Sequence, residues 1–173
     1  VPIFKKEFKK RNFDKKEIKI SYSYERVMPG NNYYNSVVNY WRVFSSNNEI
    51  TKKKSMKFLS KVINVKKYPL TYLDSFTACE LSKILENTFR ATNIALIDEW
   101  SKFAEKNNID LFKIIDAIRV RPSHRNLMLP GFGVGGYCLT KDPLFGDVAS
   151  KKYFNHKNLN FPISKMSVRI NNN

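Results

Sequence analysis

Residues 77–108 read TACELSKILENTFRATNIALIDEWSKFAEKNN, a run without proline or glycine. Its start matches a capping box, in which the hydroxyl of Thr77 and the carboxylate of Glu80 bond free backbone amides at a helix start. The run predicts one helix of about 30 residues that ends near Asn107 and is roughly 45 Å long. Such length is typical of a helix that forms the spine of a dimer. Its apolar positions are Leu81, Ile84, Leu85, Ile94, Ile97, Trp100 and Phe103.

Short strands and helices alternate before this helix. We predict a basic amphipathic helix at the N-terminus, a strand over Glu17 to Tyr22 and a strand over Tyr40 to Phe44. A helix over Lys52 to Val62 has apolar residues on one side, and a last strand falls in either 62–65 or 69–73. This alternation predicts a parallel sheet with too few strands to be complete.

The pattern after the long helix is helical. We expect a second helix over Leu111 to Ile118 and a glycine loop at Gly131 to Gly136. A third helix has Asp142 as its cap and Pro143 in its first position, a combination that favours helix starts. The predicted fold class is therefore α/β, then all-α, with one long helix.

The chain is basic and has enough hydrophobic residues to form a core. Of 173 residues, 42% are hydrophobic, and the formal net charge is +16. Such a charge favours anionic partners, which are nucleic acid, an anionic membrane or phosphorylated small molecules. Because the lysines are spread along the chain, we expect a solvated surface rather than a nucleic-acid groove. No apolar run reaches the roughly 18 residues of a membrane span, so we expect a soluble protein without membrane partners. The low cysteine count favours a reducing compartment, so we expect the protein to be cytoplasmic.

The chain has two cysteines, Cys79 and Cys138, too few for a disulfide framework. Neither belongs to a Cys-x-x-Cys pair, and His124 and His156 lack partners at ligand spacing, so we expect no metal site. Cys79, inside the long helix, is expected to be a packing residue. The chain begins at Val1 without a methionine and ends in three asparagines. We interpret both ends as cuts in a longer protein.

The glycines Gly131, Gly133 and Gly136 fit the pattern G-x-G-x-x-G of dinucleotide-binding folds. We reject that interpretation because the fingerprint follows a buried strand, whereas residues 125–130 hold few apolar residues and a proline. The acid that binds ribose about 20 residues later in that fold is also missing. These glycines and Gly135 either let backbone amides approach a ligand or serve a plain structural loop.

Cys138 has the surroundings of a nucleophile. It lies between the last glycine and the expected helix cap, close to Lys141. Backbone amides, a helix N-terminus and a cation favour the thiolate, which is the reactive form of cysteine. The alternative is a small buried hydrophobic residue.

Lys83, Asn87 and Arg90 share one face of the long helix because they follow the spacing i, i+4 and i+7. A cation and an amide donor one turn apart suit a developing oxyanion. The alternative is that these residues form the wet side of the helix. Glu25 ends a strand before a Pro-Gly turn, where functional residues of α/β sheets gather; the alternative is an exposed turn carboxylate.

Together these motifs resemble the UDP-glucose/GDP-mannose dehydrogenase family. The matching stretches are 21–30 (SYSYERVMPG), 80–95 (ELSKILENTFRATNIA) and 130–143 (PGFGVGGYCLTKDP). The resemblance implies an NAD-binding Rossmann domain, a helical dimerisation domain and a C-terminal domain. Residues 1–74 correspond to the tail of the first domain and 75–173 to the second, so the NAD fingerprint is missing.

The resemblance also implies the chemistry. The family oxidises a sugar's primary alcohol to a carboxylate in two hydride transfers to NAD. Cys138 would form a thiohemiacetal and then a thioester, with Lys83 and Asn87 stabilising the oxyanion. The other implied roles are water positioning or proton transfer by Asp142, thioester hydrolysis by Glu25, cofactor contact by Lys141, and sugar-nucleotide binding by Arg90, Gly131, Gly133, Gly135 and Gly136.

This chain departs from the family pattern in places. Tyr137 stands where UDP-glucose and GDP-mannose enzymes usually have serine, and Pro29 stands where a second glutamate is common. The form Gly-Val-Gly-Gly-x-Cys is closer to dehydrogenases of UDP-N-acetylhexosamines, whereas Lys141-Asp142 is closer to the UDP-glucose type.

We therefore expect a piece of an NAD-dependent UDP-sugar 6-dehydrogenase that supplies uronic acids for surface polysaccharide. We expect it to form a homodimer through the long helix and to be inactive alone. The alternatives are a dimerisation module without activity and a basic nucleic-acid-binding protein.

Overall fold

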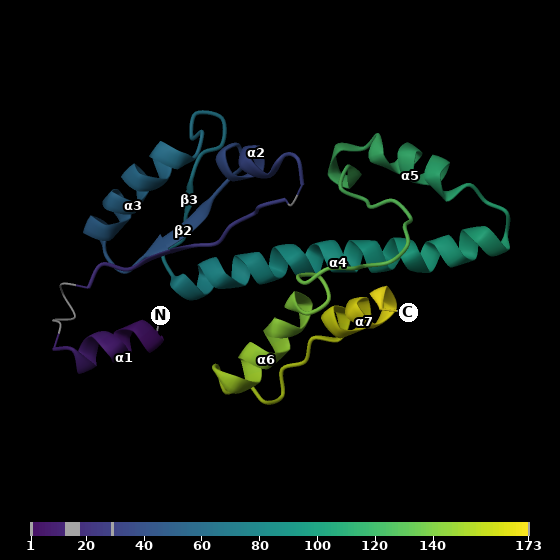
Figure 1. Cartoon of the computed structure of the whole chain (residues 1–173). Helices are drawn as coiled ribbons and strands as arrows, with labels where there is room; N and C mark the ends of the chain where they lie inside the picture. The colour runs from purple at the N-terminus through teal and green to yellow at the C-terminus, as the bar shows by residue number, and fades with distance from the viewer. Residues whose placement is uncertain (1, 13–17, 29, 173) are drawn as a thin grey trace. The chain divides into compact units, whose positions relative to one another are not determined.

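A computed structural model gives the structure of residues 2–12, 18–28 and 30–172 (Figure 1). The chain divides into two compact units, Val1–Ser82 and Lys83–Asn173, and helix α4 (Phe76–Lys106) has residues in both. In the described residues, the first unit combines helices with a three-stranded sheet, and the second is helical. The predicted order of mixed α/β and then helical structure is confirmed. The domain boundary at 74/75 stays a prediction.

In the first unit, β1 (Ser21–Ser23), β2 (Val43–Ser46) and β3 (Thr71–Tyr72) lie in the order β1-β2-β3. Strand β3 is parallel to β2, but β1 is antiparallel to it, so the prediction of a parallel sheet is wrong for β1. The connections explain the difference. Helix α3 (Glu49–Val62) carries the chain back along the sheet before β3, whereas the short helix α2 (Tyr33–Val38) lies between β1 and β2.

The early strands are offset from their predicted positions. The aromatic run from Tyr40 to Phe44 overlaps β2 only at its end, because the buried residues that complete β2 are serines. The strand predicted from Glu17 to Tyr22 overlaps the first part of β1, and Glu17 lies outside the described residues. Strand β3 occupies the second predicted position, 69–73. The helices predicted at the N-terminus and over 52–62 are confirmed by α1 (Pro2–Lys10) and α3.

The core of the first unit joins the sheet to the start of α4. Tyr24, Val43 and Cys79 are buried together, and Tyr22 and Leu73 pack against them. Cys79 has no exposed surface, which confirms that it is a packing residue. Burial raises the pKa of its thiol because the apolar surroundings disfavour the thiolate.

Helix α4 begins before the predicted capping box. The hydroxyl of Ser75 accepts a hydrogen bond from the backbone N–H of Ala78 at 3.3 Å, and the Ser75 carbonyl accepts from Cys79 N–H at 3.1 Å. Ser75 is therefore the cap, and Thr77 already lies in the first turn, so the capping box at Thr77 and Glu80 is wrong. The predicted length is confirmed by the 31 residues of α4. No described helix, α4 included, has the combined length and apolar character to cross a membrane.

Helix α5 (Leu111–Arg119) confirms the second predicted helix and lies along α4 in the second unit (Figure 1). Ile97 and Ala104 of α4 are buried against Leu111 and Ile115 of α5. This apolar contact holds the two helices together, and Leu127 and Met128 of the segment after α5 pack against it.

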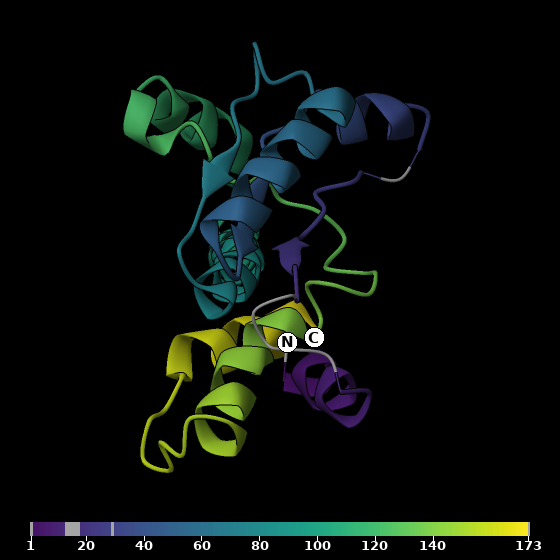
Figure 2. The ribbon, with the colours of Figure 1, turned by 90° about the vertical axis from the view of Figure 1, so that its left-hand side faces the viewer.

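Helices α6 (Phe145–Lys152) and α7 (Pro162–Asn171) lie on the opposite side of α4 from α5 (Figures 1 and 2). Asp147 of α6 forms ion pairs of 2.9 Å with Lys165 of α7 and with Lys151, and these two lysines lower its pKa. Helix α7 is absent from the sequence prediction because its buried face is largely polar. That face consists of Ser164, Ser167, Val168 and Asn171.

Ser75→Ala tests where α4 begins. The substitution removes an acceptor from a helix amide, and we expect the free energy of unfolding to fall by about 1 kcal/mol. Urea unfolding of the chain, followed by circular dichroism, measures the change. Thr77→Ala is the control and should cost clearly less, because Thr77 does not cap the helix. A larger loss for Thr77→Ala than for Ser75→Ala would restore the capping box.

Candidate functional site

Helix α4 presents Lys83, Asn87 and Arg90 on successive turns, but their exposure differs. Asn87 is buried, Lys83 is half-buried and Arg90 is exposed. A buried amide is stable only when its polar atoms have hydrogen-bond partners. The partner of Asn87 therefore identifies what this face of α4 meets.

That partner is Asp142, whose carboxylate is also buried. Its Oδ2 accepts a hydrogen bond from Asn87 Nδ2 at 2.7 Å, and its Oδ1 lies 3.2 Å from the ammonium of Lys141. Asp142 begins a short 3-10 helix, η2 (Asp142–Leu144), that leads into α6, with Lys141 in the cap position. The prediction that Asp142 caps a helix is therefore wrong, because its oxygens bond Asn87 and Lys141.

Lys141 lies between two aromatic rings. Its ammonium is 4.1 Å from the ring centre of Tyr137 and 4.9 Å from that of Phe145. Contact with ring faces stabilises a cation and restrains a flexible lysine side chain. The sequence contains an overlooked signal for these contacts: both aromatic residues lie four positions from Lys141.

Cys138 lies in the turn that precedes Asp142, the hydrogen-bond partner of Asn87. Its carbonyl accepts hydrogen bonds from the backbone N–H of Asp142 at 2.9 Å and of Lys141 at 3.2 Å. The thiol is exposed, so the interpretation as a small buried hydrophobic residue is wrong. The arrangement places an accessible sulfur on the same turn as a buried, hydrogen-bonded carboxylate.

The glycine loop is exposed and irregular. Gly133 has φ of +96° and Gly136 has φ of +87°, which residues with a side chain rarely adopt. Within the described residues, no strand lies between α5 and the loop, which supports rejection of the dinucleotide fingerprint. Asn93 of α4 anchors the loop: its Oδ1 accepts from Met128 N–H at 3.0 Å, and its Nδ2 donates to the Asn126 carbonyl at 2.6 Å. We did not predict this role, although asparagine inside a helix is itself a signal.

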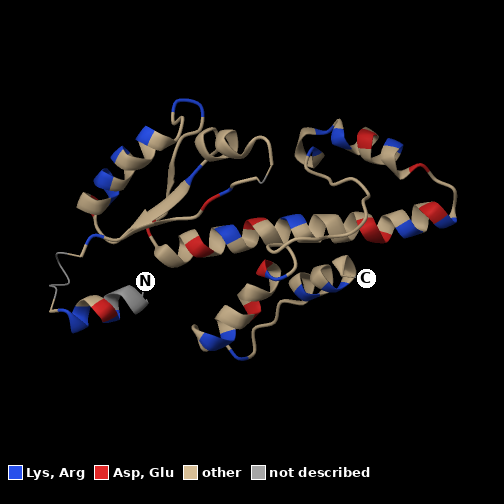
Figure 3. Ribbon diagram, viewed as in Figure 1, with Lys and Arg blue, Asp and Glu red and all other residues tan. Residues whose placement is uncertain are grey.

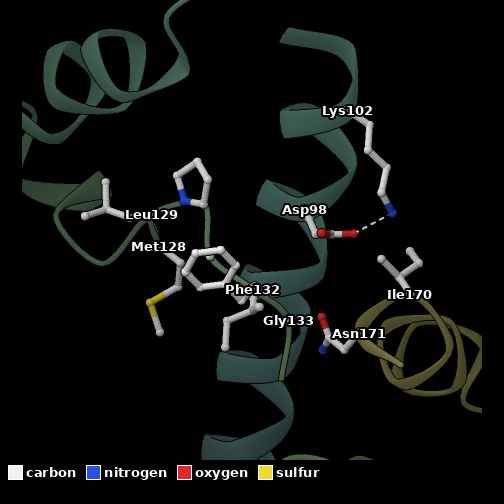
Figure 4. A pocket seen from close by; sticks show the side chains of 11 residues that line it. Asp98, Lys102, Met128, Leu129, Phe132, Gly133, Ile170 and Asn171 are labelled. Atoms are coloured by element: carbon white, nitrogen blue, oxygen red, sulfur yellow. Dashed lines mark hydrogen bonds and ion pairs between the residues drawn. The ribbon is translucent and has the colours of Figure 1, made fainter. Parts of the chain in front are cut away.

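A pocket of about 360 Å³ lies where this loop, α4 and α7 meet (Figure 4). Of the predicted binding residues, Gly131 and Gly133 line it. Asp98 and Lys102 form a 2.8 Å ion pair at its α4 wall. Asn171 donates from Nδ2 to the Ala91 carbonyl, and its buried Oδ1 has no hydrogen-bond partner among the described residues. The pocket has the size of a small-molecule site.

Glu25 belongs to the first unit. It follows the buried Tyr24, and its exposed carboxylate accepts a short hydrogen bond from the backbone N–H of Val27. Within the part of the chain that is described, no cluster of at least three His, Cys, Asp or Glu side chains is arranged to hold a metal ion.

Residues 77–173 match the central domain of the UDP-glucose/GDP-mannose dehydrogenase family. The match covers more than half of the chain. It includes Lys83, the Asn87–Asp142 contact and Cys138, whereas Glu25 lies before it.

Curated relatives extend the similarity toward the N-terminus. The UDP-N-acetyl-D-mannosamine dehydrogenase of Methanocaldococcus jannaschii is 34% identical over 138 residues, which are 80% of this chain and 31% of the relative. The protein of the same name from Pyrococcus horikoshii is 32% identical over 124 residues, which are 72% of this chain and 28% of the relative. The chain spans less than a third of the length of these relatives.

Solved structures share the fold. The UDP-D-ManNAc dehydrogenase from Pyrococcus horikoshii has a TM-score of 0.72 at 26% identity, over 89% of this chain and 34% of that one. The NDP-N-acetyl-D-galactosaminuronic acid dehydrogenase from Methanosarcina mazei has a TM-score of 0.73 at 26% identity, over 91% of this chain and 34% of that one.

Asn87→Ala tests the contact that holds this site together. It leaves an oxygen of the buried Asp142 without a donor, and we expect the free energy of unfolding of the chain to fall by about 1–3 kcal/mol. Arg90→Ala is the matched control on the same helix and should change stability by no more than about 0.5 kcal/mol, because Arg90 is exposed. Chemical denaturation measures both. Equal losses for the two variants would show that the Asn87–Asp142 bond is not structural.

Proposed function

Because this chain belongs to the UDP-glucose/GDP-mannose dehydrogenase family, we propose that it is part of an NAD-dependent enzyme that oxidises the C6 alcohol of a UDP-sugar to a uronic acid. The observation that carries this proposal is the buried Asn87–Asp142 contact, which fastens the turn of Cys138 to α4. Under this proposal, residues 1–74 are the tail of a Rossmann-like NAD-binding domain and 75–173 are the helical dimerisation domain. The enzyme acts in the cytoplasm, and its product serves surface polysaccharide.

Cys138 is the proposed nucleophile. Its sulfur attacks the aldehyde carbon that the first oxidation produces, and the carbonyl oxygen becomes an oxyanion. Asn87 uses one amide hydrogen for Asp142, so its second amide hydrogen is available for the oxyanion. Lys83, one turn earlier on α4, supplies a positive charge. Oxidation of the resulting thiohemiacetal gives a thioester on Cys138.

Hydrolysis of the thioester releases the acid. A water oxygen bonds to the thioester carbon, the carbon–sulfur bond breaks, and sulfur leaves as the thiolate of Cys138. Glu25 accepts the proton of the water, and Asp142 positions water or passes protons, in the roles that their family positions imply.

When bound, NAD supplies the hydride acceptor for both oxidations. The residue of this chain proposed to contact it is Lys141, whose side chain is 36% exposed and carries a charge that suits a pyrophosphate. The described residues contain no strand followed by a glycine fingerprint, so we assign no further cofactor contact to them.

The sugar nucleotide is proposed to bind along the glycine loop. The loop is exposed and offers amides at Gly131, Gly133, Gly135 and Gly136, and the pocket beside it is large enough for part of such a ligand. Arg90, exposed on α4, supplies a cation for its phosphates. A UDP-sugar is favoured because both curated relatives described above are named as dehydrogenases of a UDP-sugar.

A homodimer through α4 is supported by an exposed apolar stripe. Its side chains are 41–69% exposed and fall within about 100° of arc on the helix. Large apolar side chains gathered on one exposed face mark an interaction surface. The α4 stripe consists of Leu81, Leu85, Phe89, Leu96, Trp100 and Phe103. The same stripe would serve a dimerisation module without activity of its own.

Nucleic-acid binding has less support. Acidic and basic side chains alternate along α4, which therefore carries no continuous basic track (Figure 3). Binding to a polyanion requires basic residues clustered on one surface.

Substitutions in the full-length protein that contains this chain test the chemistry. We expect Cys138→Ser to abolish acid formation while the sugar nucleotide still binds, because a serine hydroxyl has no low-pKa anion. Lys83→Ala should lower the rate by about 10²–10³-fold, the scale for losing one oxyanion donor. Cys79→Ser is the control and should cost stability but little activity. NADH formation measures all three, and near wild-type turnover of Cys138→Ser would refute the proposed nucleophile.

The dimer has a direct test in sedimentation velocity. We expect the chain to sediment as a dimer and Leu85→Lys to convert it to a monomer, because a charge in the centre of an apolar contact is not solvated. Ile163→Lys on α7 is the matched control, since Ile163 is as exposed as Leu85 but lies off the α4 stripe. A folded wild-type monomer at high concentration would contradict the proposal.

A further inference from the structure

Arg42 is a buried cation that the proposed chemistry does not use. It lies directly before β2 and is only 8% exposed. Removing a guanidinium from water is costly unless nearby groups compensate its charge and satisfy its donors. Its surroundings therefore indicate what the arginine does.

One donor of Arg42 fixes the peptide that leads into Glu25. Arg42 Nη1 donates to the carbonyl of Tyr24 at 2.9 Å, and this carbonyl belongs to the peptide bond between Tyr24 and Glu25. The pairing of β1 with β2 ends at Ser23, so the strand ladder no longer holds this peptide. The hydrogen bond from Arg42, the residue before β2, therefore holds Tyr24, the residue after β1.

The charges around Arg42 point to the same glutamate. Burial lowers the pKa of Arg42, the negative charge of Glu25 raises it, and Arg26 lowers it. Arginine stays protonated in proteins, so the negative charge of Glu25 offsets part of the cost of burying Arg42. The Glu25 carboxylate also accepts a hydrogen bond from the backbone N–H of Val27. Glu25 is thus restrained through its peptide, its charge and its own carboxylate.

We propose that Arg42 is a positioning residue for Glu25, which it holds at the end of β1 in the orientation needed to accept a proton from water. The inference rests on the proposed role of Glu25 in hydrolysis of the Cys138 thioester. Arg42 acts through the peptide bond that leads into Glu25 and has no part of its own in the proposed chemistry. Its loss should therefore slow hydrolysis and leave both the first oxidation and sugar-nucleotide binding unchanged.

The experiment measures the thioester on Cys138 in the full-length protein. Turnover with a UDP-sugar and NAD is quenched, and intact-protein mass spectrometry gives the fraction of enzyme that carries the sugar adduct. We expect Arg42→Met to slow hydrolysis by about 10²-fold, the scale for a catalytic group misplaced by about 1 Å, and so to accumulate the adduct. Arg42→Lys, which keeps the charge and a donor, should fall between Arg42→Met and wild type.

Val43→Ala is the matched control. Val43 is buried in the core of the first unit next to Arg42, so its truncation should destabilise the protein without changing the bond to Tyr24. We expect it to lower the melting temperature and to show a wild-type adduct level. Adduct accumulation in Val43→Ala equal to that in Arg42→Met would assign the effect to general destabilisation and overturn the inference.

Glu25→Gln separates this inference from the proposed function. If Glu25→Gln does not accumulate the adduct, the proposed role of Glu25 fails. If Glu25→Gln accumulates it and Arg42→Met does not, only the positioning role fails. Should Arg42→Met not fold, Arg42→Lys decides: an adduct level above wild type supports the proposal, and a wild-type level overturns it.

Discussion

One hydrogen bond, from the amide of Asn87 to the carboxylate of Asp142, joins positions 55 residues apart in the sequence. Both side chains are buried, so neither finds a substitute partner in water when the other is removed. The bond holds the turn of Cys138 and the first residue of η2 against α4. It uses one of the two amide hydrogens of Asn87, so this structural contact is compatible with the proposed oxyanion contact.

The second constraint is that α4 is continuous and carries small residues where other segments approach it. Ala91 and Ala95 are buried, and the side chain of Asn171 reaches the backbone carbonyl of Ala91. A larger residue at 91 would need space that the packing does not offer, because Ala91 has no exposed surface. On the opposite side, Ala104 lets α5 pack closely. A single helix thereby serves both the apolar contact with α5 and the polar contact with α7.

Much of the helical structure could be predicted because long-range contacts do not determine it. The run without proline or glycine set the length of α4, and the apolar spacing set α5. The predictions are wrong where a tertiary contact, or a hydrogen bond from a neighbouring residue, determines the local structure instead. Ser75 caps α4 ahead of Thr77, and the carboxylate of Asp142 is drawn away from its helix by Asn87 and Lys141. Helix α7 buries serines and an asparagine, which no apolar pattern reveals.

Candidate residues for the site were recognisable from residue type and spacing, whereas their partners were not. The aromatic contacts of Lys141 and the loop anchor Asn93 depend on how the chain turns back, which the sequence does not state directly. The two cysteines differ for the same reason: Cys79 has no exposed surface, and Cys138 is exposed. A thiol reagent should therefore modify one sulfur in the native chain and two after denaturation. The number of labelled thiols per chain therefore reports the fraction of molecules that are folded.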